Sequence, residues 1–208
     1  MLRPNNHFSV TNPLHRISSL MILFFFITLS FFACSNAAGG NEGYAIGGRG
    51  PGGGTIFYYD EDGFEMIDTA EICYYLEVSP AFTEEYPWAS TGKTNFNTGA
   101  TETAIGTGRY NTYLILADSA DPEAPAAKAC AEYRGGGKSD WFLPSFDELE
   151  ELRKKKDFIN IPYGDYWPSS EISSGGTFYI LFALDGYLQM VNSKSKSESI
   201  KVRAVRAF

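Results

Sequence analysis

The chain has 208 residues, of which 44% are hydrophobic, 15% aromatic and 20% charged, with 21 glycines and 10 prolines. This composition excludes a disordered or fibrous chain and favours short strands and loops over a helix bundle. The formal net charge is −8. Because general nucleic-acid binders are basic, we expect no nucleic-acid partner.

The N-terminal segment has the pattern of an export signal. Arg3 and Arg16 precede the apolar run LMILFFFITLSFF at residues 20–32. This run is shorter than the roughly 20 residues of a membrane span and suits the core of a signal peptide. We therefore expect residues 1–33 to be a signal peptide, followed by a small, polar tether up to residue 43.

The end of that segment, Ala33 followed by Cys34, resembles a bacterial lipoprotein signal. In that family the chain is cut before the cysteine, which is then acylated. Acylated Cys34 would make the membrane a partner, since more than one acyl chain on one cysteine anchors a protein durably. Ser35 after the cysteine points to the outer membrane or the cell surface. Two alternatives stay open: secretion after cleavage near Ala38, and an uncleaved anchor.

Removal of residues 1–33 would take away two of the 17 basic residues and both histidines, leaving 15 basic and 25 acidic residues and a net charge of −10. A mature chain without histidine excludes Ser-His-Asp and Cys-His catalysis and histidine-ligated metals. We expect no metal and no cofactor. Carboxylate pairs like those of glycosidases occur in almost any acidic chain, so catalysis is the least favoured function.

The glycine run at residues 47–54 formally matches G-x-G-x-x-G through Gly48, Gly50 and Gly53. A dinucleotide fingerprint needs a helix after the glycines, whereas residues 55–59 have a strand pattern. We therefore interpret the run as a glycine-rich turn.

The next elements follow from turn residues and hydrophobic periodicity. In chain order, we expect a strand at 55–59, a hairpin turn at 60–63, a returning strand at 64–67, a strand at 73–78 ended by Pro80, a loop over 81–104, a helix near 109–118, and a second helix from residue 121 that the glycines at 135–137 stop.

The strongest local pattern predicts a helix with Ser145 as its N-cap. Ser145 and Glu148 form a predicted capping box, and acidic residues in the first turns and basic residues in the last match the helix dipole. Phe146, Leu149 and Leu152 supply the buried stripe.

The last third of the chain has the pattern of strands. We expect a strand at 178–184, a hairpin turn at Asp185 and Gly186, a return at 187–191, a polar loop at 192–199 and a final strand at 200–208, in which Lys201 and Arg203 alternate with apolar residues. Strands, then helices, then strands predict one α+β domain over residues 44–208.

Two cysteines lie within this domain. Cys73 falls on a predicted strand and Cys130 on a predicted helix. In an exported protein they can form a disulfide. Two buried free thiols are the alternative, and the sequence does not decide between them.

Four motifs, in order, resemble the C-terminal domain family of the Legionella collagen-like protein. They are GPGGGTIFY at 50–58, DWFLPS with DEL at 140–149, YWPSSE at 166–171 and VRAVRAF at 202–208. Pro168 departs from the serine usual in the family.

The resemblance implies a C-type-lectin-like fold, with two or three helices beside small antiparallel sheets and a long irregular loop. Many members are exported, some act in adhesion, and none has established catalytic residues. The calcium-binding tripeptides of lectins are absent from the sequence, so we predict no calcium site.

Together these features predict a surface-tethered, non-catalytic binding or adhesion module for glycan or extracellular protein ligands. Its exposed aromatic and amide side chains would bind the ligand. The candidates are Trp88, Asn95, Asn97, Tyr163, Tyr166 and Asn192, whereas Trp141 and Trp167 are expected in the core. The alternatives are a structural envelope protein without a small ligand, and a scaffold for variable display.

Overall fold

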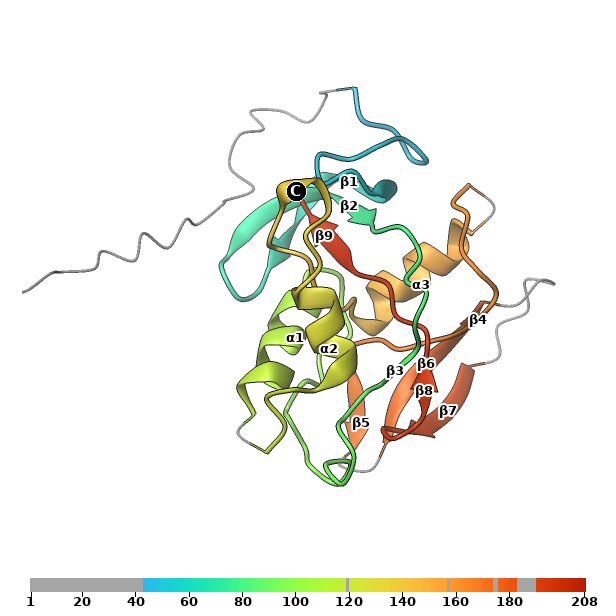
Figure 1. The fold of residues 1–208 in the computed structure, drawn as a ribbon. Coiled ribbons are helices and arrows are strands. Elements are labelled where there is room, and N and C mark those ends of the chain that lie inside the picture. The colour runs from blue at the N-terminus through green and yellow to red at the C-terminus, as the bar shows by residue number, and fades with distance from the viewer. Residues whose placement is uncertain (1–42, 119, 157, 174–175, 183–189) are drawn as a thin grey trace, which may run out of the picture. The chain divides into compact units, whose positions relative to one another are not determined.

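The computed structural model describes residues 43–208 except for residues 119, 157, 174–175 and 183–189. The first sheet joins both ends of this region. Strands β1 (Thr55–Met66), β2 (Glu71–Val78) and β9 (Val205–Ala207) pair antiparallel in the order β1-β2-β9 (Figure 1). Tyr44 packs edge-on against Phe208, with 5.2 Å between the ring centroids. The C-terminal strand therefore holds the start of the folded region in place.

The expected hairpin turn at residues 60–63 is wrong. The register passes from Tyr59 opposite Tyr75 to Phe64 opposite Cys73, so β1 continues beyond an irregularity at 60–63. Gly63 adopts φ +76° there, a value that favours glycine. Such bulges bend a strand without ending it, and the chain reverses instead at residues 67–70.

The helices are α1 (Gly108–Ala117), α2 (Pro125–Ala131), the 3-10 turn η1 (Gly135–Gly137) and α3 (Phe146–Lys154). The capping box of α3 is confirmed: Ser145 Oγ accepts from Glu148 N at 3.3 Å, and Glu148 Oε2 accepts from Ser145 N at 2.8 Å. Helix α2 begins later than expected, with Pro125 in its first turn, where a missing N–H is harmless.

The other strands form two small antiparallel sheets. Strands β4 (Gly164–Tyr166), β5 (Glu171–Ser173) and β7 (Met190–Ser195) each pair with β6 (Gly176–Phe182), and β3 (Tyr86–Pro87) pairs with β8 (Ser199–Ile200). The expected turn at Asp185 and Gly186 lies outside the described residues. The expected polar loop and final strand are wrong in part, because β7 extends to Ser195 and irregular chain separates β8 from β9.

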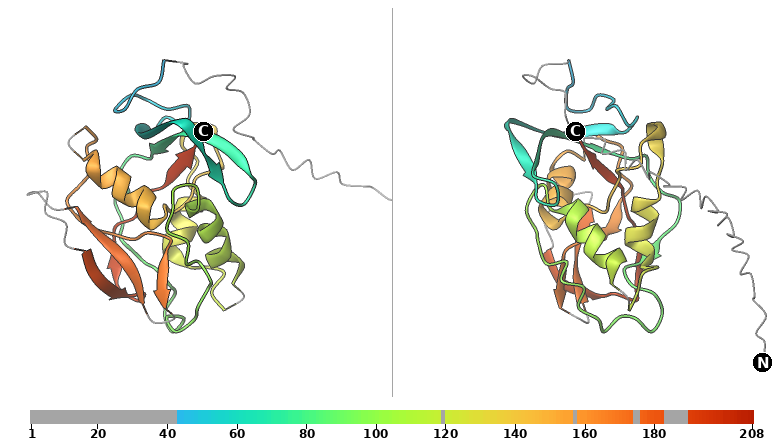
Figure 2. Two further views of the ribbon diagram at one scale, coloured as in Figure 1. Left: turned by 180° about the vertical axis from the view of Figure 1, so that it is seen from behind. Right: turned by 90° about the vertical axis from the view of Figure 1, so that its left-hand side faces the viewer.

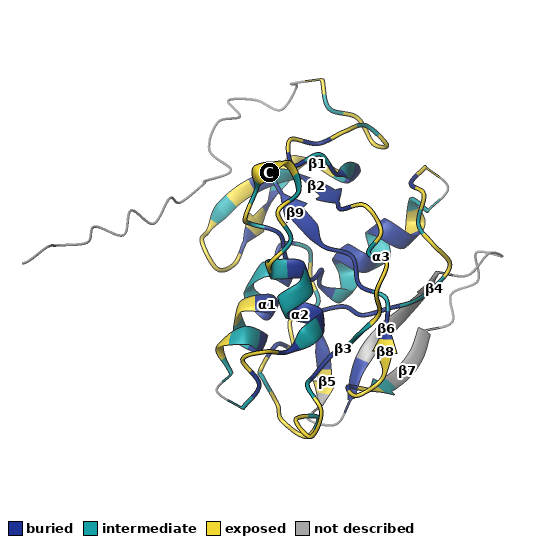
Figure 3. Cartoon of the chain, viewed as in Figure 1, coloured by how far each residue is buried: buried dark blue, intermediate teal, exposed yellow. Residues whose placement is uncertain are grey.

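Two clusters of buried side chains form the core. The first includes Phe57, Leu76, Leu149 and Leu152, and α3 lies between the first sheet and the sheet around β6 (Figures 1 and 2). The second gathers Trp88, Trp141 and Trp167 with alanines of α2. Figure 3 shows the buried faces of the helices turned inward. The described part of the chain is thus α+β, and it contains no helix long and apolar enough to cross a membrane.

Candidate functional site

The glycine run encloses a buried carboxylate. Glu77 on β2 accepts hydrogen bonds from Gly52 N at 2.8 Å and Gly54 N at 2.9 Å, and it pairs with Arg206 at 3.1 Å. A Cβ would lie 2.7 Å from Glu77 Oε1 if placed at Gly52, and 2.4 Å from Oε2 if placed at Gly50. The run is therefore a tight turn, as expected, with a structural role around Glu77.

A second buried ion pair holds the long loop. Lys196 Nζ lies 2.6 Å from Glu171 Oε2, with both side chains fully buried, and donates to Phe96 O at 2.8 Å. The ammonium also lies 4.5 Å from the centre of the Trp88 ring, a cation–π distance. Glu171 Oε1 accepts from Gly99 N at 2.7 Å. This pair therefore fastens residues 96–99 to the C-terminal strands.

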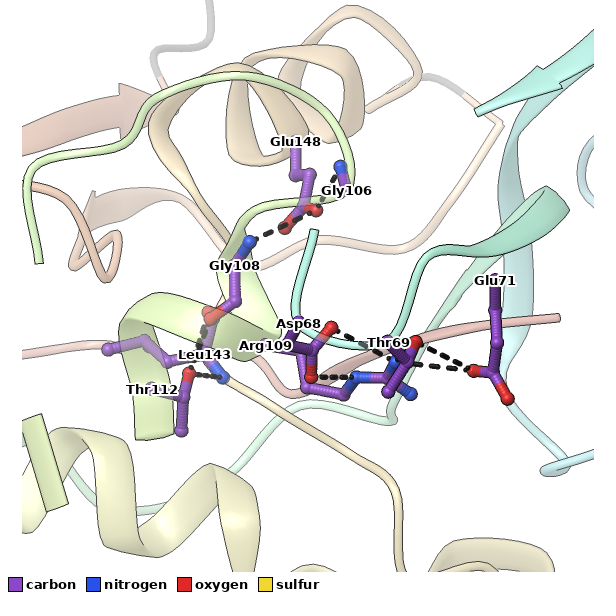
Figure 4. Close-up of polar contacts among 9 residues, drawn as sticks. All are labelled: Asp68, Thr69, Glu71, Gly106, Gly108, Arg109, Thr112, Leu143 and Glu148. Carbon is purple, nitrogen blue, oxygen red and sulfur yellow. Dashed lines mark hydrogen bonds and ion pairs between the residues drawn. The ribbon is translucent and has the colours of Figure 1, made fainter. Parts of the chain in front are cut away.

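Glu148, in the first turn of α3, is a buried carboxylate that reaches the backbone at the start of α1 (Figure 4). Its Oε1 accepts from Gly106 N at 2.9 Å and Gly108 N at 3.4 Å, while Oε2 belongs to the capping box of α3. One side chain therefore satisfies backbone donors at the beginning of two helices. Burial raises the pKa of Glu148 to about 7, although hydrogen bonds from Ser145, Gly106 and Gly108 oppose the shift.

We expect Glu148 to make stability depend on pH. Its pKa is about 7 in the folded state, against an ordinary value of 4.5. Between these two pH values Glu148 is ionised in the unfolded chain but still protonated in the folded one, which favours unfolding. The contribution of Glu148 to the free energy of unfolding is therefore fully present below pH 4.5 and is lost as the pH rises to about 7. The expected loss is about 3 kcal/mol. Urea unfolding between pH 4 and pH 8 measures it. Glu148→Gln should lack this component, and an identical pH profile for both proteins would contradict the assignment.

Arg109 lies in the first turn of α1 and is more exposed to solvent than Glu148 (Figure 4). Its guanidinium pairs with Asp68 at 2.8 Å and Glu71 at 3.3 Å and donates to Thr69 at 2.7 Å. These contacts join α1 to the turn between β1 and β2. Partly exposed pairs of this kind stabilise a protein only modestly.

Arg203 differs from these paired charges. It is 3% exposed, and it forms no ion pair with a carboxylate of the described residues. Its Nη2 donates to Ser79 O, whereas Nε and Nη1 have no hydrogen-bond partner in the described part of the chain. Burial lowers the pKa of Arg203, while the phenols of Tyr166 and Tyr133 oppose the shift. A buried cation without a matching anion is costly, so its retention points to a role beyond packing.

Two residues with unpaired polar atoms line one cleft. Four buried side-chain polar atoms of the described residues lack partners, and three of them are Arg203 Nε, Arg203 Nη1 and Ser79 Oγ. Both residues line an open cleft of about 290 Å³. Its other lining residues are Gly53, Gly54, Thr55, Pro80, Ala81, Ile159, Asn160 and Pro162.

The guanidinium of Arg203 contacts two segments beside this cleft. It donates to Ser79 O. It also interacts with the Tyr166 hydroxyl, which donates to Pro162 O at 2.8 Å. Ser79, Pro162 and Arg203 itself all line the cleft. We refer to this feature as the Arg203 cleft.

Exposed aromatic side chains lie beside the cleft in the sequence. Residues 159, 160 and 162 line it, and Phe158 and Tyr163 flank them with 73% and 57% exposure. Tyr163 is thus exposed, as expected from the sequence. Among the predicted ligand-binding residues, it is the one that directly follows a lining residue.

The exposure expected for Trp88 and Tyr166 is wrong, since each is 1% exposed. Trp88 Nε1 donates to Pro168 O at 3.0 Å, and the Tyr166 hydroxyl donates to Pro162 O. A backbone carbonyl that accepts the polar tip allows such a ring to be buried. Trp141 and Trp167 lie in the core, as expected.

Asn95 and Asn97 are exposed but do not line the Arg203 cleft. Asn97 Oδ1 accepts from Gly99 N at 2.9 Å, which shapes the loop locally. The cavity under this loop, beside Trp88, measures about 10 Å³ and has room for about one water molecule. Asn192 lies on β7, and its side chain is outside what the structure describes.

The two cysteines of the domain do not bond to each other. Cys130 is a free, buried thiol whose pKa is raised by burial. Cys73 is disulfide-bonded, and its partner is not among the described residues. Both alternatives drawn from the sequence, a bridge between Cys73 and Cys130 and two free thiols, are therefore wrong.

The described residues contain no group of three or more histidine, cysteine or acidic side chains arranged to hold a metal ion. In comparisons with known proteins, no family model matches the sequence, and neither does any curated protein.

Sequence patterns did not identify Arg203 or Ser79 as site residues. The sequence pattern placed Arg203 on a final strand, in alternation with apolar residues, and the structure shows that residues 202–207 are all buried. Arg206, three residues later, is also buried and pairs with Glu77 and Asp140. Two arginines in the apolar run VRAVRAF were a usable signal of buried charge. The sequence alone does not show that Arg206 rather than Arg203 has carboxylate partners, because Glu77 and Asp140 are distant in the sequence.

Proposed function

We propose that the protein is an exported, non-catalytic binding module whose ligand occupies the Arg203 cleft. One observation carries the proposal: Arg203 and Ser79, which both line the same open cleft, have buried polar atoms without hydrogen-bond partners among the described residues. Buried polar groups in native proteins are normally hydrogen-bonded. A ligand that accepts hydrogen bonds would supply the missing partners.

The absence of histidine from residues 34–208 also favours binding over catalysis. The cleft combines the polar groups of Arg203, Ser79, Thr55 and Asn160 with apolar walls, as small-molecule sites usually do. Exposed Phe158 and Tyr163, which adjoin lining residues in the sequence, would extend the contact surface.

We further propose a C-type-lectin-like arrangement and membership of the family of the Legionella collagen-like protein C-terminal domain. The four ordered motifs support the family. Among the described residues, the small antiparallel sheets, the three α-helices, and the long irregular chain between β2 and α1 support the fold.

The anchor is proposed to be a lipid on Cys34, at the outer membrane or cell surface. The apolar run at residues 20–32, followed by Ala33 and Cys34, supports this anchor. A thioether-linked lipid leaves no thiol, so Cys34 of a lipidated chain cannot be the disulfide partner of Cys73. We expect the intact mass of the protein from native membranes to show a chain starting at Cys34 with acyl chains attached. A mass that shows no acyl chains, and that falls by two hydrogen atoms when a disulfide forms on oxidation, would contradict the anchor.

A binding screen tests the proposed function. The protein, purified from membranes in detergent, is applied to immobilised glycans and extracellular-matrix proteins. We expect a saturable ligand that Arg203→Met weakens about 10-fold to 100-fold, since hydrogen bonds to a charged group contribute about 1.5–3 kcal/mol. Arg134→Met removes an exposed arginine and should leave binding unchanged. Ligands insensitive to Arg203→Met, or none at all, would contradict the proposal.

A further inference from the structure

We infer that the Arg203 cleft recognises a carboxylate with an oxygen on a neighbouring carbon, as in a uronic acid or another sugar acid. This inference rests on the proposed function and adds the chemical class of the ligand. It depends on the charge of the cleft, on its unpaired donors and on the character of its walls.

The charge of the cleft matches a monoanion. Arg203 is the one charged residue among the described residues that line it. Nearby Glu77 is already paired with Arg206 and bonded to the glycine turn. A phosphate dianion placed there would leave part of its charge uncompensated in a partly desolvated site, whereas one carboxylate matches one guanidinium.

The backbone also disfavours phosphate. Phosphate sites commonly use several free backbone N–H groups around the anion. Here the N–H groups of Gly53, Ser79 and Ile159 donate to carbonyl groups, and that of Gly54 donates to Glu77. Pro80 and Pro162 have no N–H. Six of the ten described lining residues therefore offer no backbone donor to an anion, and the unpaired side-chain donors belong to Arg203 and Ser79.

The two unpaired nitrogens of Arg203 point to two acceptors. The planar guanidinium has two edges that can face an acceptor: Nε and Nη2 form one, and Nη1 and Nη2 form the other. A carboxylate can pair along one edge, which leaves a donor on the other edge free. An oxygen on the carbon next to the carboxylate would accept from that donor, and Ser79 Oγ could bond either group.

The walls suit one sugar ring. Ile159, Pro162, Pro80 and Ala81 offer apolar surface, while Thr55 and Asn160 offer polar groups for hydroxyls. The volume of about 290 Å³ is at the lower end of the range for small-ligand pockets. The ligand is thus a single acidic ring, free or at the end of a longer glycan.

Calorimetric titration of the membrane-purified protein with four probes tests the inference: glucuronate, glucose, hexanoate and inorganic phosphate. We expect saturable binding of glucuronate, about tenfold weaker binding of hexanoate, and no binding of glucose or phosphate. Arg203→Met should abolish the glucuronate heat, Ser79→Ala should weaken binding about fivefold, and Arg134→Met should change nothing. Glucose or phosphate binding as tightly as glucuronate would overturn the inference, and so would equal affinity for hexanoate.

The experiments distinguish a failure of the ligand class from a failure of the binding cleft. If glucuronate does not bind while the screen yields an Arg203-dependent ligand, the assigned ligand class is wrong and the binding cleft stands. If neither experiment gives an Arg203-dependent ligand, both are wrong. Unfolding curves of each variant confirm that lost binding does not reflect a lost fold.

Discussion

Lys196→Met is expected to lower the free energy of unfolding by about 3–5 kcal/mol, because it leaves the fully buried carboxylate of Glu171 without its cation. The loop carbonyl of Phe96 also loses its donor. Urea unfolding at pH 7 measures the change. The matched control is Lys201→Met, which breaks the exposed pair with Glu85 and should change stability by less than about 1 kcal/mol.

A second variant makes this test sharper. Adding Glu171→Gln to Lys196→Met removes the unpaired charge and should restore part of the lost stability. Equal losses in Lys196→Met and Lys201→Met would show that the buried pair does not hold the loop as described.

Glu77→Ala is expected to destabilise the fold by a similar amount, about 3–5 kcal/mol. It leaves the N–H groups of Gly52 and Gly54 without acceptors and Arg206 without one of its two carboxylate partners. Thermal and urea unfolding measure the loss.

Glu77→Gln preserves the shape of the side chain and one acceptor, so its loss should be smaller than that of Glu77→Ala. Glu84→Ala removes an exposed carboxylate and should have little effect. A glycine turn that remains ordered in Glu77→Ala, with unchanged stability, would contradict the role given to Glu77.

Sequence patterns predicted best where structure is determined locally. The capping box at Ser145 and Glu148 and the strand at 73–78 are confirmed within a residue or two. Each depends on neighbours a few residues away, so the pattern contains most of the needed information. The hairpin expected at 60–63 failed because the same residues form a bulge when the partner strand continues alongside.

Buried charge was the main feature that local patterns missed. Lys196 lies in the polar run NSKSKSES, yet it is fully buried beneath Trp88 and pairs with Glu171. Its environment depends on contacts with residues 25 to 100 positions away. Arg203 was missed for the same reason. Tyr163 was chosen correctly as exposed, since aromatic residues in polar loops often remain at the surface.

Arg203 should behave differently from the paired charges. Arg203→Met removes an unpaired buried cation, so we expect stability to change by about 1 kcal/mol or less, although the bond to Ser79 O is lost. Binding should fall strongly in the same variant. This contrast between Arg203→Met and Lys196→Met separates a group kept for ligand binding from one kept for stability.

The most direct test of the Arg203 cleft is the NMR signal of the Arg203 Nε–H during titration with glucuronate, assigned by its loss in Arg203→Lys. The account predicts a saturable shift of that signal as the unpaired donor gains an acceptor. A signal that stays unchanged while glucuronate binds elsewhere on the protein, or does not bind, would contradict the account.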